Sequence, residues 1–188
     1  QHKAPSYVTW QIDRSVCVTN VCVSECKHCV SHVSPESNEA FITSIEEYID
    51  KVEELLKYGG EQFILQGGMH PNLGLAFYKQ LFRQLKELFP KIKLHALGPS
   101  EIAVLAQQEK MNPSEVLEEL VESGLDSLPG YGADILCDRV RSELSPGKPN
   151  ADAWLQVMRE AHRLNLPTSA SMMFGHLERV EERIEHLI

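Results

Sequence analysis

Residues 44–68 read SIEEYIDKVEELLKYGGEQFILQGG, and this stretch decides the fold. Its first part has apolar residues at intervals of three and four, separated by acids and lysines, which predicts an amphipathic helix. Ser44 with Glu47 three residues later is a capping-box signature for the helix start, and Gly59-Gly60 favours its end. Residues 62–66 are a short β-rich run, so the stretch predicts a helix followed by a strand.

The same helix-and-strand unit recurs along the chain. Helical patterns at 75–89, 112–123 and 154–164 precede apolar runs at 92–96, 125–128 and 168–173. The predicted strands therefore start near positions 62, 92, 125 and 168, at intervals of 30, 33 and 43 residues. Alternating strands and helices predict an α/β fold with parallel pairing, in either an open doubly wound sheet or a barrel.

Glycine-containing loops follow four of the predicted strands. They are Gln66-Gly67-Gly68, Leu97-Gly98-Pro99, Pro129-Gly130-Tyr131-Gly132 and Phe174-Gly175. Any one of these loops is explained by glycine and proline turning the chain between elements. Four at the same position favour a barrel, in which the loops after the strands share one rim and build the active site.

Length and composition set limits on the function. The 188 residues carry 18 Lys+Arg against 27 Asp+Glu, a net charge of −9, with 43% apolar residues, which suits one globular domain over residues 1–188. Without a basic cluster, nucleic acid is not expected as a partner, and no apolar run approaches the ~20 residues that span a bilayer. We expect a cytoplasmic protein with no membrane partner. The start at Gln1 and the end at Ile188, directly after a helical pattern, indicate a piece of a longer protein.

The cysteines indicate metal or redox chemistry. An odd number of them, without a leader segment, argues against a disulfide framework. Three lie in CVSECKHC, as Cys22, Cys26 and Cys29, and three thiolates suit a soft, cluster-binding site. An ordinary 4Fe-4S carrier uses four thiolates, so three would leave one iron open, as catalytic metal sites are.

Other uses of the cysteines and histidines stay open. His28 or His32 would complete a Cys₃His zinc site, which would make the chain a zinc-stabilised, non-catalytic binding module. Cys17 and Cys137 are expected to be small core residues, and either would be a fourth ligand only if the fold brings it close.

The string from Tyr7 to Cys29, YVTWQIDRSVCVTNVCVSECKHC, resembles the cluster loop of radical S-adenosylmethionine (SAM) enzymes. Later strings resemble one branch of that family, which contains the futalosine-pathway menaquinone enzymes and the deazaflavin synthases. Within the branch, the likeness is greatest to cyclic dehypoxanthine futalosine synthases, chiefly in HALGPSEI and MMFGHLERVEERIEHL. The other matching strings are ILQGG (64–68), GLDSLPGYGADILCDRVR (124–141), SPGK (145–148), WLQVMREAHRL (154–164) and SASMMFGH (169–176).

The resemblance implies a fold and two cofactors. The fold would be a partial (β/α)₆ TIM-type radical SAM barrel, with Val8–Ile12 as its first strand. Counting that strand gives about five βα units, so a sixth strand and a C-terminal cap would be missing. Cys22, Cys26 and Cys29 would ligate a 4Fe-4S cluster whose open iron binds SAM, and the reduced cluster would cleave SAM to a 5′-deoxyadenosyl radical. The partners implied are a small nucleoside-type substrate and an electron donor such as flavodoxin or ferredoxin.

The resemblance also supplies candidate SAM-binding and substrate-binding residues. Gln66, Gly67 and Gly68 match the loop that binds the SAM amino group, and glycine lets the backbone approach a ligand. The further candidates are His28, Ser127, Asp134, Arg141 and Ser171, each of which would otherwise be a cap, surface or hydrogen-bonding residue. His28 departs from the aromatic residue usual before the third cysteine, Gly130–Asp134 from the usual glycine triplet with Ala-Glu, and Val30-Ser31-His32 from the usual aromatic segment.

The expected reaction is the cyclisation of dehypoxanthine futalosine in menaquinone biosynthesis. Aminofutalosine synthase and a deazaflavin synthase subunit are the enzyme alternatives. No catalytic acid or base is assigned, although His70, His95 and His176 near strand ends are candidate proton acceptors. The acidic residues Glu178, Glu181, Glu182 and Glu185 are expected on a solvated helix face.

Overall fold

The protein forms an α/β fold around a parallel sheet. The computed structural model describes residues 8–29 and 32–188. Its strands are β1 (Asp13–Cys17), β2 (Gln62–Gln66), β3 (Lys93–Ala96) and β4 (Leu125–Ser127), all parallel and in the order β1-β2-β3-β4. A sheet in which the spatial order of the strands follows their order in the sequence is typical of a barrel. In a doubly wound sheet the strand order reverses partway through the sheet. The predicted barrel-type α/β class is confirmed.

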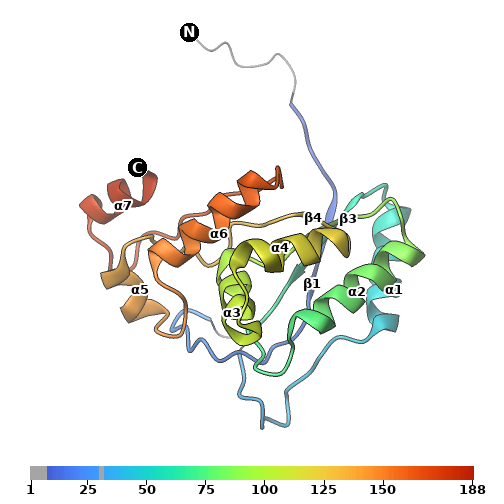
Figure 1. Cartoon of the computed structure of the whole chain (residues 1–188), viewed down its shortest axis with the longest axis horizontal. Helices are drawn as coiled ribbons and strands as arrows, with labels where there is room; N and C mark the ends of the chain where they lie inside the picture. The colour runs from blue at the N-terminus through green and yellow to red at the C-terminus, as the bar shows by residue number, and fades with distance from the viewer. Residues whose placement is uncertain (1–7, 30–31) are drawn as a thin grey trace.

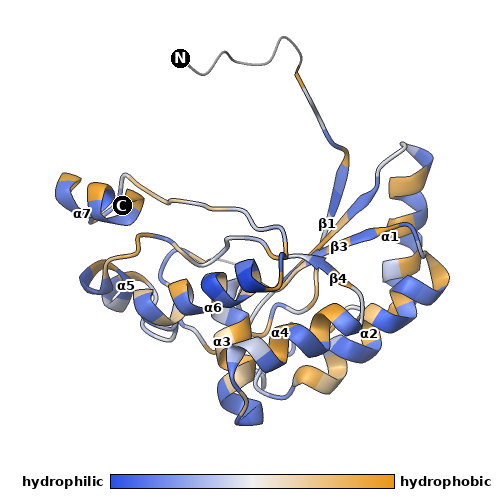
Figure 2. Ribbon diagram, turned by 45° about the horizontal axis from the view of Figure 1, so that its top comes forward, coloured by the Kyte–Doolittle hydropathy of each residue, from blue (hydrophilic) through white to orange (hydrophobic). Residues whose placement is uncertain are grey.

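Helices follow one another around the outside of this sheet. Figures 1 and 2 show α1, α2, α4 and α6 along one side of it, as successive crossovers of one hand require. The helices are α1 (Ile45–Lys57), α2 (Leu75–Leu88), α3 (Pro99–Glu109), α4 (Pro113–Glu122), α5 (Asp138–Leu144), α6 (Ala151–Arg163) and α7 (Val180–Leu187). The predicted capping box of α1 is present, with Ser44 Oγ accepting from the Glu47 N–H at 3.3 Å.

The two faces of the sheet differ in polarity. Phe63, Leu65 and Leu94 are buried in the core between the sheet and the helices. Alternate residues of a strand point to opposite sides, and the residues on the opposite face are mostly polar. Ser15, Ile64, His95 and Ser127 lie in one register row across that second face. The face covered by the helices therefore forms the hydrophobic core. The other face lies toward the interior of the barrel.

The first strand lies five residues later than predicted. Residues 8–12 form no strand, and Val8 and Trp10 are 92% and 79% exposed. Val16 and Val18 are buried instead, and Cys17 pairs with Gln66 in the register of β1 and β2. Burial of those two valines explains the shift, which brings the end of β1 directly to the cysteine loop.

The predicted strand at 168–173 is wrong. In its place, a single parallel bridge joins Leu128 to Thr168. Beyond the bridge, the Gly130 N–H donates to Ser169 Oγ at 2.9 Å and Ser171 Oγ donates to the Gly130 carbonyl at 2.6 Å. Side chains thus make the bonds that a strand ladder would make, and the segment stays irregular. None of the helices among the described residues is long and apolar enough to cross a membrane.

Candidate active site

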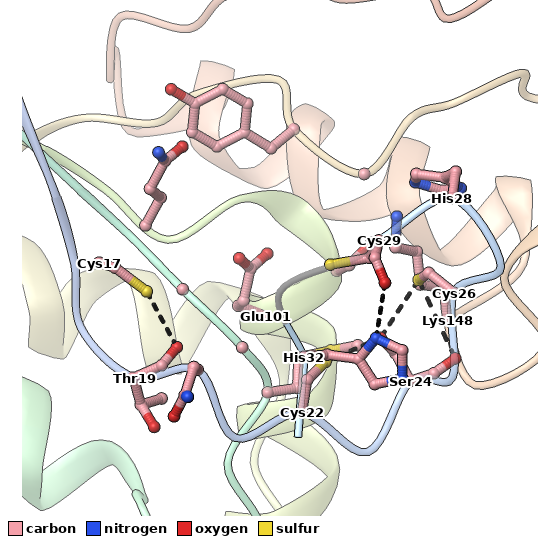
Figure 3. A pocket seen from close by; sticks show the side chains of 18 of the residues that line it. Cys17, Thr19, Cys22, Ser24, Cys26, His28, Cys29, His32, Glu101 and Lys148 are labelled. Carbon is pink, nitrogen blue, oxygen red and sulfur yellow. Dashed lines mark hydrogen bonds between the residues drawn. The ribbon is translucent and has the colours of Figure 1, made fainter. Parts of the chain in front are cut away.

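The loop after β1 carries three thiols into one pocket. Cys22 Sγ lies 2.9 Å from Ser24 Oγ, and the same hydroxyl lies 3.2 Å from Cys26 Sγ (Figure 3). Cys26 is buried, while Cys22 and Cys29 are half-buried. The turn between them uses a left-handed backbone at Glu25, with φ 49°. Two of the sulfurs therefore sit on either side of one hydroxyl.

Neighbouring segments fix the path of this loop. The Val23 N–H donates to the Met69 carbonyl at 3.1 Å, and the Lys27 N–H donates to the Leu144 carbonyl at 2.8 Å. The loop is thereby held both by the turn after β2 and by the end of α5.

Glycines let the cysteine loop pack closely on its supports. A Cβ at Gly68 would stand 2.1 Å from the Val21 carbonyl oxygen, and one at Gly147 would stand 2.6 Å from Ser24 Cα. Such approaches are shorter than any ordinary van der Waals contact. The need for glycine at Gly68 therefore follows from packing against the cysteine loop as well as from any ligand.

The pocket itself has a volume of about 800 Å³ and lies among the loops that follow β1 to β4. Its wall brings together residues far apart in the sequence, which include the three cysteines. The predicted site residues that line it are Cys22, Cys26, His28, Cys29, Gln66, Gly67, Gly68 and Asp134. Of the four glycine-containing loops predicted to form one rim, those at 66–68 and 129–132 contribute to the pocket wall, whereas neither 97–99 nor Phe174-Gly175 lines it.

Ser127, Arg141 and Ser171 do not line this pocket. Ser127 Oγ lies 2.6 Å from His95 Nδ1, and Ser171 donates to a backbone carbonyl. Arg141 is only 2% exposed, and its guanidinium donates to the carbonyls of Gly132, Ala133 and Pro149 at 2.6–3.0 Å. In this structure Arg141 ties the loop after β4 to the segment that leads into α6.

An enclosed ion pair faces the cysteine loop. Lys148 Nζ lies 3.0 Å from Asp134 Oδ2, and His28 Nε2 lies 3.9 Å from Asp134 Oδ1. Burial raises the pKa of Asp134, but Lys148, His28 and the Ser145 hydroxyl together lower it further, so the net pKa lies below the ordinary value. Burial, opposed by Asp134, lowers the pKa of His28, which favours its neutral form.

Sequence analysis missed several residues of the wall, above all Glu101, Ser100 and Lys148. Glu101 points from the first turn of α3 into the middle of the pocket (Figure 3). Burial raises the pKa of Glu101, against the lowering effect of nearby backbone N–H groups and of Lys148. The signal available in the sequence was Pro99-Ser100-Glu101 after a strand, which marks a helix start at the rim.

The three candidate histidines lie outside the pocket lining. His70 Nδ1 accepts from the Asn72 N–H at 3.0 Å, and His176 Nε2 lies 2.8 Å from the Met173 carbonyl oxygen. Burial is the main cause that lowers the pKa of His95, which contacts Ser127. Each histidine thus has a local structural partner.

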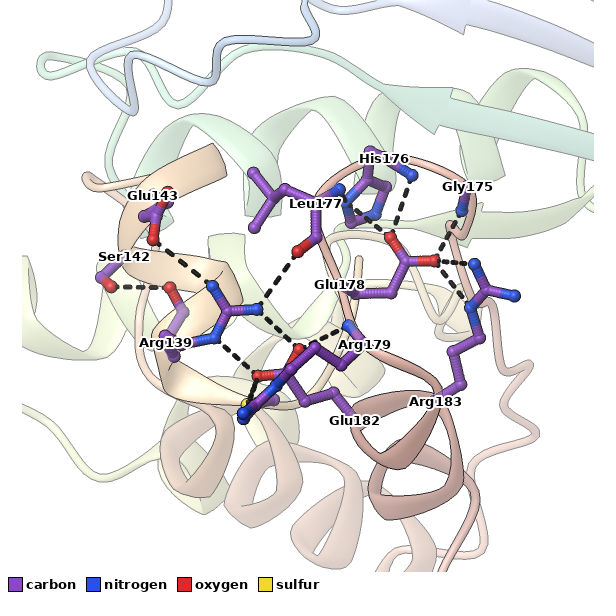
Figure 4. A network of polar contacts seen from close by, with 11 residues as sticks. Arg139, Ser142, Glu143, Gly175, His176, Leu177, Glu178, Arg179, Glu182 and Arg183 are labelled. Atoms are coloured by element: carbon purple, nitrogen blue, oxygen red, sulfur yellow. Dashed lines mark hydrogen bonds and ion pairs between the residues drawn. The ribbon is translucent and has the colours of Figure 1, made fainter.

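The predicted solvated face of the last helix is wrong for two of its acids. Glu182 is 2% exposed, and its carboxylate accepts from Arg139 Nε at 2.7 Å and Nη2 at 2.6 Å (Figure 4). Glu178 accepts from the N–H groups of Gly175 and His176 and pairs with Arg183. The Arg139–Glu182 bonds dock α7 onto α5, and Glu178 ties the turn before α7 to Arg183 of that helix; a helical pattern of charges does not reveal either contact.

The other cysteines and His32 lie in different surroundings. Cys17, expected in the core, is exposed on the pocket wall, and Cys137 Sγ donates to Glu182 Oε1 at 3.5 Å. His32, the other candidate zinc ligand, also lines the pocket, where its Nδ1 lies 2.7 Å from the Cys29 carbonyl oxygen. The rest of the unusual Val30-Ser31-His32 segment, like Tyr7, falls outside the described residues.

The donors in the pocket fit an iron–sulfur cluster. Cys22, Cys26 and Cys29 face one cavity large enough for a cluster and a ligand. Within 8–29 and 32–188, no group of three or more His, Cys, Asp or Glu side chains is arranged to hold a metal ion. Thiolates that bind different irons of one cluster need not converge on a single point.

Comparisons with known proteins agree with this arrangement. The sequence model of the Radical SAM superfamily matches residues 16–188. A 5-amino-6-(D-ribitylamino)uracil–L-tyrosine 4-hydroxyphenyl transferase of Methanosarcina barkeri is 38% identical over 181 residues, which are 96% of this chain and 47% of that enzyme. The cyclic dehypoxanthine futalosine synthase of Streptomyces coelicolor is 34% identical over 180 residues, 95% of this chain and 45% of that enzyme.

A solved structure shares the fold. Methylornithine synthase superimposes with a TM-score of 0.75 at 17% identity, over 94% of this chain and 49% of that protein. The chain spans about half the length of the curated relatives it matches. Enzymes of the matched family use a 4Fe-4S cluster and SAM. The match covers nearly the whole described chain, including the three cysteines that face the pocket, so the chain belongs to the radical SAM superfamily.

Proposed function

We propose that this chain is the cluster- and SAM-binding part of an enzyme that cyclises dehypoxanthine futalosine in menaquinone biosynthesis. The observation that carries the proposal is the placement of Cys22, Cys26 and Cys29 on one wall of a pocket of about 800 Å³. The similarity to the Streptomyces coelicolor synthase supports the choice of substrate.

Each part of the pocket has a role in this proposal. Cys22, Cys26 and Cys29 would hold the cluster, which, when reduced and loaded with SAM, supplies a 5′-deoxyadenosyl radical. Gln66 lines the pocket at the end of β2, and Gly67-Gly68 let the turn after β2 lie directly against the loop that carries Cys22. The pocket walls would orient the bound ligand relative to the three cysteines.

The enclosed pair of Lys148 and Asp134 suits a zwitterionic ligand group. A carboxylate on the ligand would turn toward the ammonium of Lys148 and an ammonium toward Asp134, so that neither protein charge loses its partner. The α-amino acid end of SAM has this chemistry. His28, neutral because burial lowers its pKa, offers a flat ring for stacking beside the pair.

A second candidate is the transfer of the hydroxyphenyl group of tyrosine to 5-amino-6-(D-ribitylamino)uracil. The Methanosarcina barkeri relative carries that name at 38% identity, and the same pocket would accept either class of substrate. The electron donor is proposed to be a flavodoxin or ferredoxin and the location the cytoplasm, where thiols stay reduced.

Anaerobic turnover followed by mass spectrometry tests the proposal. The reconstituted chain is incubated with SAM, a reductant and either dehypoxanthine futalosine or the uracil with tyrosine, with Cys26→Ala as the inactive control. Free 5′-deoxyadenosine together with a cyclised nucleoside supports the cyclisation of dehypoxanthine futalosine. A hydroxyphenyl adduct of the uracil supports the second candidate function instead. An adenosyl-bearing product would contradict both and indicate an aminofutalosine synthase. Stoichiometric zinc with no iron or sulfide would instead support a non-catalytic module.

A further inference from the structure

One serine hydroxyl lies between two of the three pocket cysteines. Ser24 Oγ hydrogen-bonds to Cys22 Sγ at 2.9 Å and to Cys26 Sγ at 3.2 Å, as the dashed lines of Figure 3 show. Ser24 is only 2% exposed, so water hardly competes with the sulfurs for this hydroxyl. The two hydrogen bonds are therefore stronger than they would be at the protein surface.

Two other buried serines use their hydroxyls differently. Ser123 Oγ donates to the Glu119 carbonyl at 2.8 Å at the end of α4, and Ser145 Oγ donates to Asp134 at 3.1 Å. Bonds of the first kind satisfy a serine within its own helix. In the part of the chain that the structure describes, the Ser24 hydroxyl bonds to no oxygen or nitrogen and only to the two sulfurs. Its surroundings thus point to a role at the sulfurs.

The segment after α5 fixes the backbone of Ser24. The Gly147 N–H donates to the Ser24 carbonyl at 3.1 Å, and a Cβ at Gly147 would stand 2.6 Å from Ser24 Cα. The next residue, Lys148, pairs with Asp134 at 3.0 Å, which anchors the segment in turn. The position of the hydroxyl is therefore set by the packing of its backbone as well as by the sulfurs.

Ligation of iron fixes the direction of these hydrogen bonds. Between a hydroxyl and a free thiol, either group can be the donor. A cysteine that ligates iron is a thiolate, which carries no proton and can only accept. With a cluster bound, the Ser24 hydroxyl is therefore the donor, and its single proton goes to Cys22 or to Cys26.

We propose that Ser24 is a positioning residue whose hydroxyl donates to the cluster thiolates and raises the reduction potential of the cluster. The inference rests on the assignment of the cluster to the three cysteines in the proposed function, and it holds for either candidate substrate. Reduction adds one electron, taken from an external reductant, and part of the added negative charge lies on the thiolate sulfurs. A hydrogen-bond donor stabilises the reduced state more than the oxidised state for that reason. Without the hydroxyl, the reduction potential falls.

A redox titration of the anaerobically reconstituted 188-residue chain with dithionite, followed by electron paramagnetic resonance, measures the midpoint potential. We expect Ser24→Ala to weaken reduction about tenfold, which lowers the midpoint of a one-electron couple by ~59 mV. Ser24→Thr retains a hydroxyl and should stay near the wild-type midpoint. Ser34→Ala, at an exposed serine later in the connection between β1 and α1, is the matched control and should leave the midpoint unchanged.

A wild-type midpoint in Ser24→Ala would overturn the role of the hydroxyl. A second measurement uses the wild-type chain alone, so that it does not depend on how well the variant loads iron. Electron–nuclear double resonance of the reduced chain should show a proton coupled to the cluster that is lost in heavy water, and the absence of such a proton would also overturn the proposal. Iron and sulfide measured on the same samples separate the two proposals: a loaded cluster whose potential ignores Ser24 removes only this inference, whereas a wild-type chain without a cluster removes both.

Discussion

Lys148 Nζ lies 3.0 Å from Asp134 Oδ2, and the two side chains are only 12% and 8% exposed. The same carboxylate oxygen accepts from Ser145 Oγ at 3.1 Å. Asp134 holds this place with a left-handed backbone, φ 47°, that aspartate and asparagine tolerate better than most residues. This ion pair joins the loop after β4 to the segment that supports the cysteine loop.

Asp134→Asn should destabilise the protein by about 3 kcal/mol at pH 7, because it leaves the ammonium of Lys148 enclosed without a countercharge. Asparagine keeps the backbone conformation, so the change isolates the charge. Urea unfolding measures the loss. Glu54→Gln, which breaks the more exposed Arg14–Glu54 pair of 2.8 Å, is the matched control and should cost less than about 1 kcal/mol.

The effect of Asp134→Asn should depend on pH in one direction. Since the folded state lowers the pKa of Asp134, its contribution is complete above the unfolded value of about 3.9 and is lost as the pH falls through the lower folded-state pKa. The difference in unfolding free energy between wild type and variant should therefore be constant from about pH 5 to 7 and shrink below about pH 4. A difference that grows on acidification would contradict the assignment.

Gly68→Ala should disturb the cysteine loop. The added Cβ would stand 2.1 Å from the Val21 carbonyl oxygen and 2.8 Å from Cys22 Cβ, so the backbone before the first cysteine must move. We expect a loss of about 2 kcal/mol or more in stability and a lower iron content after reconstitution. Gly59→Ala adds a methyl group with nothing within 4 Å, at φ +74°, and serves as the control with normal iron content.

Arg141→Lys should cost about 2–4 kcal/mol, because lysine replaces a planar fork that donates to three backbone carbonyls by a single ammonium. Burial lowers the pKa of Arg141, against the attraction of Asp134, but arginine stays charged. Thermal unfolding checks the loss. If Arg141 instead contacts a ligand directly, the variant would unfold normally and weaken SAM binding.

Local patterns predicted the elements better than the site. The regular spacing in 45–57 and the Ser44 cap identify α1 because that helix is amphipathic, whereas α3 packs on both α4 and α6 and so lacks a clean polar stripe. The alternating residues 8–12 resemble a strand, but register with β2 is set by burial of Val16, which sequence alone does not reveal.

The site shows the same limit. Cys22, Cys26 and Cys29 are close in sequence, so their spacing predicts a shared site. Lys148 and Glu101 reach the same pocket from distant segments, and only the tertiary fold brings them together. Arg141 was predicted to bind a ligand from the family resemblance. Its guanidinium donates to the carbonyls of Gly132 and Ala133 instead, and the sequence does not reveal these contacts.

Glu182→Gln should loosen α7 from α5. The carboxylate pairs with Arg139 and Arg179, whose hydrogen bonds hold its pKa well below the ordinary value, so the contribution is present above about pH 4.3 and is lost in acid. Hydrogen exchange should become faster across Val180–Leu187 in the variant at pH 7. Glu181→Gln, at an exposed position of the same turn, should leave the exchange unchanged.

Iron and acid-labile sulfide after anaerobic reconstitution, with electron paramagnetic resonance before and after adding SAM, test the central proposal most directly. We expect about four irons per chain and a reduced signal that SAM shifts, as an open iron requires. Both should be lost in Cys26→Ala and kept in Cys137→Ala, whose sulfur lies outside the pocket lining. Iron that persists in Cys26→Ala, or a signal that SAM leaves unchanged, would contradict the assignment of the three cysteines to a SAM-binding cluster.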